Sequence, residues 1–339
     1  MSIHTPESNG IFRHILYSYR IGRKKTAMKM TVEDGDREKQ AMKWLISQTS
    51  VSQSQMDALT HISRWRAIGL RRAHQSDIEG AEKVMHVARS KLDLVGLPQL
   101  AYLFGNTFQL AAEAYIDYRL HEYEEANKKM QWSLEINNQL VKLGCTPLEP
   151  RRVHLCRNKV RVDAFAQRYD AAMSLAAKEL SYLMGNYVNG NFKADLNRQL
   201  LNEMTREERW ALCYQLFKEV ALILTKVDDA TGSKLLTILI SEFGSLDKLE
   251  DEQFVFEPAL KWLRLKQTYY FDSRDRYLEA AADFIKEGEG EWPVLWQAVR
   301  FDMYNSCQSL DHPEAYELQQ IIRRDVMNST DLPKPLQPA

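Results

Sequence analysis

Apolar residues recur at three- and four-residue steps along most of the chain, a spacing that places them on one face of an α-helix. Within residues 50–74, for example, Met56, Leu59, Ile62 and Trp65 follow this spacing after a polar start that can cap a helix. Similar segments are separated by short stretches that contain glycine or proline. The pattern predicts an all-α fold built from antiparallel helical hairpins.

Three short stretches of the chain share one pattern. SDIEGA, HEYEEA and QRYDAA each place an apolar or aromatic residue three positions before an alanine, and the alanines are about 45 residues apart. A small residue allows the two helices of a hairpin to approach closely, while its larger neighbour fills the space beside it. We therefore predict three copies of one hairpin. The paired positions are Ile78/Ala81, Tyr123/Ala126 and Tyr169/Ala172.

This spacing resembles the second helix of tetratricopeptide repeats, in which an aromatic residue precedes a small one by three positions. The resemblance covers roughly residues 56–187. It implies an α-α superhelix, or α-solenoid, in which the first helix of each hairpin lines a concave surface. Tyr277 and Ala280 repeat the same spacing further along the chain.

The pattern also divides the chain into segments. An asparagine-rich stretch with Gly190 interrupts the helical spacing, and Thr205 with Glu208 forms a candidate capping box where the spacing resumes. The last residues are rich in proline. The expected segments are a basic leader or capping helix that docks on the first repeat (1–35), an N-terminal helical-repeat region (36–187), a linker (188–204), a second region of helical hairpins (205–328) and a disordered tail (329–339).

Charge and cysteine content narrow the class of protein. The chain has 45 basic and 46 acidic residues, so its overall charge does not favour nucleic-acid binding. Its four cysteines form no Cys-x-x-Cys pair, which is typical of a protein in a reducing compartment. No apolar run is long enough to cross a bilayer, and the N-terminus lacks the features of a secretory signal. We therefore expect a cytoplasmic protein without a transmembrane segment.

Common motifs for nucleotide binding and nucleophilic catalysis do not occur in the sequence. It contains neither Gly-x-Gly-x-x-Gly nor Gly-x-x-x-x-Gly-Lys-Ser/Thr, and no Gly-x-Ser-x-Gly. Glu79, Glu82 and His86 share one helix face, but no matching Glu-x-x-His pair occurs on another helix. This favours a solvated helix face over a metal site. We expect no cofactor and no metal, and the sequence favours a protein that is not an enzyme.

A basic ridge is predicted on the helix that starts near residue 150. Arg157 and Arg161 are one turn apart, and His154 and Arg168 extend the same stripe. Alignment of the hairpins relates Arg157 to Arg66, and arginine can hold a carboxylate in a bidentate fork. The resemblance implies that basic and asparagine side chains on first helices bind acidic chain ends. The candidate partner-binding residues are Arg66, Asn106, His154, Arg157, Arg161 and Arg168.

The same arginines have a second interpretation, in which they form salt bridges to acids on neighbouring helices, such as Glu113 or Asp163, and hold the stack together. The favoured function is a scaffold or adaptor that binds a protein or peptide segment, preferably acidic, in a concave and partly basic groove. One alternative is an all-α enzyme or small-molecule sensor with a pocket between the two halves. Another is a regulator whose basic leader, residues 11–29, contacts nucleic acid or an anionic surface. The acidic stretches 249–257 and 286–291 could instead contact a basic partner, including the leader of the same chain.

Overall fold

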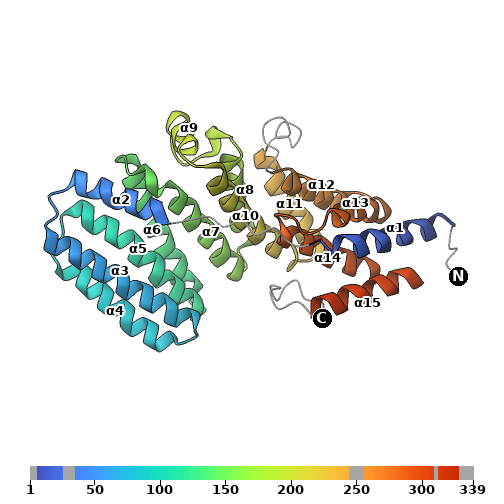
Figure 1. Cartoon of the computed structure of the whole chain (residues 1–339), viewed down its shortest axis with the longest axis horizontal. Helices are drawn as coiled ribbons and strands as arrows, with labels where there is room; N and C mark the ends of the chain where they lie inside the picture. The colour runs from blue at the N-terminus through green and yellow to red at the C-terminus, as the bar shows by residue number, and fades with distance from the viewer. Residues whose placement is uncertain (1–5, 26–34, 244–255, 309–311, 328–339) are drawn as a thin grey trace. The chain divides into compact units, whose positions relative to one another are not determined.

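The computed structural model describes residues 6–25, 35–243, 256–308 and 312–327. Within these residues the regular structure consists of helices alone, which confirms the predicted all-α class (Figure 1). The chain divides into two compact units: a central unit, Val32–Leu212, and a terminal unit made of Met1–Thr31 and Cys213–Ala339. The predictions for residues 26–29, for the acidic stretch 249–255 and for the tail 329–339 lie outside the described residues.

The central unit is built mainly from three helical hairpins that follow one another in sequence and lie side by side (Figure 1). A further helix, α10 (Arg206–Leu224), contains the boundary between the units. The helices of the central unit are α2 (Gly35–Gln48), α3 (Gln53–His74), α4 (Ile78–Leu94), α5 (Gln99–Arg119), α6 (Tyr123–Lys142), α7 (Glu149–Phe165), α8 (Tyr169–Leu183) and α9 (Ala194–Asn202). The hairpins are α3–α4, α5–α6 and α7–α8, and short 3-10 helices cover Thr146–Leu148 and Tyr187–Asn189.

The three hairpins turn in the same way. Ser76, His121 and Gln167 have φ angles of 66°, 64° and 60°, in the left-handed region that non-glycine residues rarely enter. At each turn this residue donates its N–H to the carbonyl three positions back, and the next residue donates to the carbonyl five positions back. This is the hydrogen-bond pattern of a Schellman helix end. The three stretches that share a sequence pattern therefore also share one backbone geometry.

The predicted small residues lie where the two helices of each hairpin meet. Ala81, Ala126 and Ala172 are all fully buried. Tyr277 and Ala280 repeat the spacing in sequence, but Ala280 is exposed and does not take the place of the buried alanines. Tyr123 and Tyr169 are the first residues of their helices, whereas α13 (Arg274–Glu287) begins three residues before Tyr277, which turns a different face of that helix inward.

The predicted capping box at the start of α10 is confirmed. The backbone N–H of Glu208 donates to Thr205 Oγ1 at 3.1 Å, and the backbone N–H of Thr205 donates to Glu208 Oε2 at 2.8 Å. These two bonds satisfy N–H groups that a helix start leaves without intrahelical partners.

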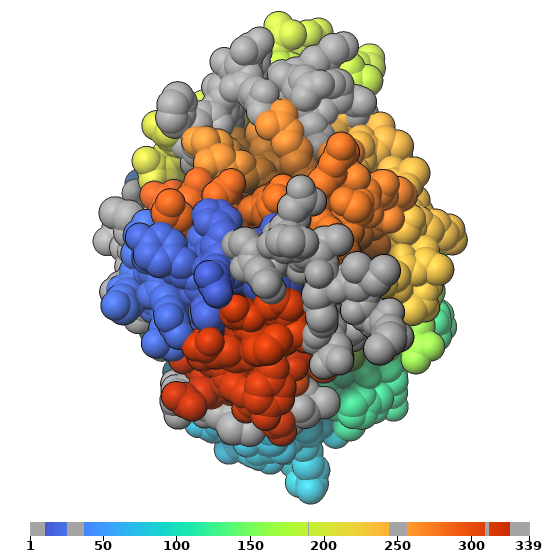
Figure 2. Space-filling model, turned by 90° about the vertical axis from the view of Figure 1, so that its right-hand side faces the viewer, coloured from blue at the N-terminus to red at the C-terminus, as the bar shows by residue number. Residues whose placement is uncertain are grey.

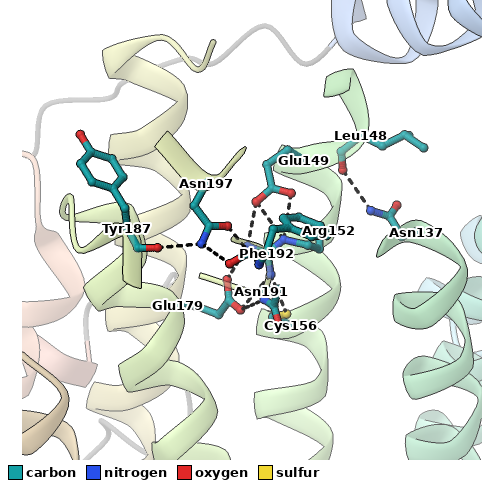
Figure 3. Close-up of polar contacts among 10 residues, drawn as sticks. All are labelled: Asn137, Leu148, Glu149, Arg152, Cys156, Glu179, Tyr187, Asn191, Phe192 and Asn197. Atoms are coloured by element: carbon teal, nitrogen blue, oxygen red, sulfur yellow. Dashed lines mark hydrogen bonds and ion pairs between the residues drawn. The ribbon is translucent and has the colours of Figure 1, made fainter. Parts of the chain in front are cut away.

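Residues 188–204, expected to be a linker, contain α9, whose Leu200 belongs to the core of the central unit. Leu200 and Leu201 are each 1% exposed. Asn197 is fully buried, and its side-chain amide donates to the carbonyls of Tyr187 and Phe192 at 2.7 and 2.8 Å (Figure 3). The polar composition therefore reflects a buried asparagine that satisfies the backbone of the preceding loop.

The terminal unit joins the first helix of the chain to its last helices. Figure 2 shows α1 in blue beside α15 in red and α13 in orange, and α1 packs against both. The expected docking of the leader on the first repeat is not what the structure shows, because the apolar residues of α1 are buried within the terminal unit. Besides α13, the unit contains α1 (Pro6–Gly22), α11 (Asp229–Phe243), α12 (Glu257–Phe271), α14 (Pro293–Gln308) and α15 (Pro313–Met327).

Close packing and charge both hold α1 in this place. A Cβ atom at Gly22 would overlap the carbonyl oxygen of Ile285 on α13, so only glycine allows this approach. The basic side chains of the leader meet acids of α15, which lie outside the acidic stretches 249–257 and 286–291 that the sequence suggested as partners of the leader. The ion pairs are Arg13–Glu314 at 3.6 Å, Arg20–Glu317 at 2.5 Å and Arg23–Asp325 at 3.1 Å.

Candidate functional site

Two of the residues predicted to bind a partner have internal roles. Asn106 is buried, and its Oδ1 accepts a hydrogen bond from Arg89 Nη1 at 2.6 Å. Arg168 lies at the third hairpin turn and forms ion pairs with Asp163, at 2.8 Å, and with Glu124. Arg168 therefore fits the second interpretation, in which arginines hold the stack together.

The other predicted residues lie on first helices. His154, Arg157 and Arg161 are partly buried on α7, and each already interacts with another group. Arg66 is half-buried on α3. The structure does not place Arg66 with Arg157, its counterpart in the sequence alignment, but with two residues that were not predicted.

Arg66 on α3 and Arg151 on α7 both lie over the ring of Phe108 on α5. The guanidinium carbon is 5.0 Å from the ring centroid for Arg66 and 3.7 Å for Arg151. All three side chains are half-buried, so part of each remains accessible. The first helices of three successive hairpins thus each contribute one side chain to a single cluster, called here the Arg66–Phe108–Arg151 cluster.

Hydrogen bonds hold the two arginines in place without neutralising them. Arg66 Nη2 donates to Ser63 Oγ at 3.0 Å, and Arg151 Nη2 donates to the carbonyl of Thr107 at 3.2 Å. Arg151 Nε is buried and has no hydrogen-bond partner in the described part of the chain. Across the described residues, no carboxylate forms an ion pair with Arg66 or Arg151. Donor capacity and positive charge both remain available at this cluster.

The electrostatics of the cluster agree with this geometry. Burial and, to a smaller extent, the charge of Arg66 together lower the pKa of Arg151 to about 9. Burial also lowers the pKa of Arg66 to about 10. The exposed carboxylate of Glu38 on α2 opposes both shifts without forming an ion pair. Both arginines stay cationic at neutral pH, and an additional anion would stabilise them.

The helix that carries Glu38 is fixed at its first turn. Arg37 donates from Nε and Nη2 to the two carboxylate oxygens of Glu208 at 2.6 Å each, and from Nη2 to the carbonyl of Glu203 at 2.7 Å. Further along α2, Ala41 and Leu45 are fully buried in the core of the central unit. Glu38 is therefore held close to the arginines by its own helix.

A second group of charged side chains in the central unit is fully buried and centred on Arg152 (Figure 3). Arg152 Nε donates to both oxygens of Glu149 at 2.8 and 2.9 Å, and its two Nη atoms donate to the two oxygens of Glu179 at 2.9 Å each. Asn191 also donates to Glu179, at 2.9 Å. This group joins α7, α8 and the loop before α9, so we assign it a structural role.

The chemistry of the buried thiols does not favour nucleophilic catalysis. Burial raises the pKa of Cys145 and Cys307 to about 12 and that of Cys156 well above its usual value, so their thiolate forms are disfavoured at neutral pH. The described residues contain no group of three His, Cys, Asp or Glu side chains placed to hold a metal ion. None of the described helices is long and apolar enough to cross a bilayer.

No protein-family model, curated protein or solved structure matches this chain. The geometry of the described residues is therefore the basis for assigning a function.

The sequence contains a signal that could have located the cluster. Arg66, Phe108 and Arg151 lie 10, 13 and 16 residues before their turn residues Ser76, His121 and Gln167. From one hairpin to the next, the contacting residue thus moves about one helical turn away from the hairpin turn, toward the start of its helix. The alignment of Arg66 with Arg157 assumes hairpins without this stagger, and so it misses Phe108 and Arg151.

Proposed function

We propose that the central unit is a non-catalytic scaffold that binds an acidic segment of a protein or peptide at the Arg66–Phe108–Arg151 cluster. The observation that carries this proposal is the convergence of two arginines from α3 and α7 on one aromatic ring, with no carboxylate of the described residues paired to either. A carboxylate from a partner would complete hydrogen bonds that the fold leaves unmade. The ring would provide apolar contact beside the charged pair.

The repeated turn geometry supports the wider architectural part of the proposal. Three equivalent hairpins whose first helices share one cluster are compatible with a tetratricopeptide-like superhelix, in which first helices form a binding surface. We further propose that the protein acts in the cytosol, in keeping with its four buried free cysteines.

Binding would work through exchange of water for carboxylate oxygens. The half-buried guanidinium groups lie in a region of lower dielectric than bulk water, where a charge-assisted hydrogen bond is stronger than at a fully exposed site. Each arginine is already oriented by its contact with Phe108, so less side-chain freedom is lost on binding. The affinity should decrease with added salt, because the interaction is between opposite charges.

The test selects random peptides displayed on phage against the full chain and measures their affinities by fluorescence polarisation. We expect the selected peptides to be rich in Asp and Glu. The double variant Arg66→Gln with Arg151→Gln should weaken binding by about 10-fold or more, since charge-assisted contacts to both arginines are lost. Arg64→Gln is the matched control, because Arg64 is exposed on the same helix two residues from Arg66, and it should change affinity by less than about twofold.

Circular dichroism and thermal unfolding establish that each variant is folded. A second double variant, Arg66→Lys with Arg151→Lys, keeps both charges but removes the forked donors and should give intermediate affinity. The proposal is rejected if no peptide is selected, if the selected peptides lack acidic residues, or if the glutamine variant binds them as tightly as the wild type.

A further inference from the structure

The terminal unit contains a cavity of about 420 Å³ whose lining is largely charged. It lies where the residues after α1 meet α14 and α15. Its volume is within the range of small-molecule sites, near the lower end. The lining residues are Arg23, Lys24, Glu289, Trp296, Gln297, Arg300 and Asp325.

One of the two carboxylates of the cavity is already engaged with its neighbours. Both oxygens of Asp325 accept hydrogen bonds from Arg23 Nη1 at 3.1 Å, and Oδ2 also accepts one from the Tyr19 hydroxyl at 3.1 Å. Burial raises the pKa of Tyr19, which keeps this hydroxyl protonated and able to donate. The Arg23 charge is therefore balanced inside the protein.

The remaining cations of the cavity are not balanced in this way. Arg300 is 5% exposed, and its Nη2 has no hydrogen-bond partner in the described part of the chain. Lys24 is exposed at the cavity and forms no ion pair with any described residue. Glu289 is the remaining carboxylate of the lining, and it accepts a hydrogen bond from Gln297 Nε2 at 3.3 Å. Two cations thus face one carboxylate.

A fixed aromatic ring forms one wall of the cavity. Trp296 Nε1 donates to the carbonyl of Ile285 at 3.0 Å, and its ring stacks on Tyr19 with centroids 5.9 Å apart. The guanidinium carbon of Arg300 lies 5.3 Å from the Trp296 ring centroid. The ring and the cation are therefore oriented by the protein before any ligand arrives, which lowers the entropic cost of binding.

We propose that this cavity binds a small molecule that carries a phosphate or carboxylate group, with Lys24 and Arg300 as its charged contacts and Trp296 as an apolar wall. Either oxyanion would supply the negative charge that the lining lacks, and Arg300 would contribute donors that the fold leaves unused. The site belongs to the terminal unit and does not depend on the function proposed for the central unit.

The test titrates the full chain separately with pyrophosphate, citrate and AMP by isothermal titration calorimetry. We expect at least one probe to bind with a Kd of about 1 mM or tighter and a stoichiometry near one. Preference for pyrophosphate over citrate would identify phosphate as the recognised group, and the reverse would identify carboxylate. Tighter binding of AMP than of pyrophosphate would show that the cavity also contacts the nucleoside part of the ligand.

Variants separate this site from non-specific anion binding. Lys24→Gln and Arg300→Met should each weaken the binding by about fivefold or more, while Arg276→Gln, an exposed arginine of the same unit, should change it by less than about twofold. Lys24 is exposed, so its variant tests the site even if Arg300→Met does not fold. The proposal is overturned if none of the three probes binds, or if Lys24→Gln binds the probes as the wild type does.

Discussion

The guanidinium carbon of Arg151 on α7 lies 3.7 Å from the centroid of the Phe108 ring, and Phe108 belongs to the preceding hairpin. A cation over an aromatic face contributes about 2 kcal/mol when water is excluded, and less when the pair is exposed. Because Arg151 has no carboxylate partner in the described part of the chain, the ring of Phe108 and the carbonyl of Thr107 are its main stabilising contacts. The two side chains should therefore be energetically coupled.

A double-mutant cycle tests this coupling. The variants are Phe108→Leu, Arg151→Met and their combination, each measured by urea unfolding. We expect a coupling free energy of about 1–2 kcal/mol, because each single variant already removes the contact that the other would remove. A second cycle pairs Phe108→Leu with Arg64→Met, whose side chain is exposed, and should give no coupling. Equal coupling free energies from the two cycles would contradict a specific interaction between Phe108 and Arg151.

The buried group around Arg152 predicts an asymmetric response to mutation. Arg152→Met leaves the carboxylates of Glu149 and Glu179 buried without their cation, and should lower the free energy of unfolding by about 3–5 kcal/mol. Glu149→Gln leaves Arg152 paired with Glu179 and should cost clearly less. Urea unfolding at neutral pH compares the two, and equal losses would show that Arg152 is not the centre of the group.

The same group predicts a pH dependence. Burial raises the pKa of Glu149 above its usual 4.5, although Arg152 opposes the shift. Removal of Arg152 should raise it further, so the folded state binds a proton more readily than the unfolded state does. The loss of unfolding free energy caused by Arg152→Met should thus be largest at neutral pH. It should shrink as the pH falls through the raised pKa of Glu149 in the folded state toward 4.5. A loss of unfolding free energy that stays constant with pH would indicate that Arg152→Met removes packing contacts and not charge compensation.

The Arg37–Glu208 pair predicts a pH dependence of opposite sign. The hydrogen bonds from Arg37 lower the pKa of Glu208 below 4.5, so the pair stabilises the fold fully above that value and is lost as pH falls through the folded pKa. Glutamine at position 208 can still form the capping box with Thr205. Glu208→Gln should therefore cost about 1 kcal/mol at neutral pH from the ion pair alone.

Unfolding in urea from neutral pH down to about pH 3 checks this prediction, and the difference from the wild type should approach zero at the acidic end. Glu207→Gln is the matched control, since Glu207 is exposed next to Glu208 and should have little effect at any pH. A cost of Glu208→Gln that does not vary with pH would assign the effect to the cap.

The sequence predicted the helices and hairpins well because their signals are local. The spacing of apolar residues, the alanine anchors and the Thr205–Glu208 box all involve residues close together in the chain. The docking of α1 on α13 and α15 was not predictable from such signals, since the ion pair between Arg23 and Asp325 joins residues 302 positions apart. Contacts of that separation depend on how the whole unit packs.

The Arg66–Phe108–Arg151 cluster was also only partly predictable from the sequence, because it depends on contacts between hairpins. Arg66 could be named from the sequence because it lies on a first helix, but its neighbours depend on the stagger between hairpins. Phe108 had no polar signal, and Arg151 lies outside the stripe formed by Arg157 and Arg161. Asn197 led to the opposite error, a structured segment predicted as a linker. An asparagine is typical of linkers in sequence, but this one is buried and donates hydrogen bonds to the backbone of the preceding loop.

The hairpin turns lead to a prediction about the repeat itself. Gln167 has a φ angle of 60°, its side chain is exposed, and no described residue forms a hydrogen bond with that side chain. The left-handed conformation costs a non-glycine residue about 1–2 kcal/mol, while glycine loses about 0.5–1 kcal/mol more chain entropy on folding. Gln167→Gly should therefore raise the free energy of unfolding by about 0.5–1 kcal/mol, and Gln167→Val should lower it by about 1–2 kcal/mol, because a β-branched residue fits this conformation poorly.

Gln131→Gly provides the matched control, because it makes the same exchange at an exposed position inside α6. There the helical φ angle suits glutamine, so glycine should cost about 1 kcal/mol. Urea unfolding of the four proteins, wild type included, should place Gln167→Gly above the wild type and Gln131→Gly below it. If both glycine variants lose stability equally, then the left-handed turn is not the conformation of Gln167 in solution, and the geometric equivalence of the third hairpin with the first two fails with it.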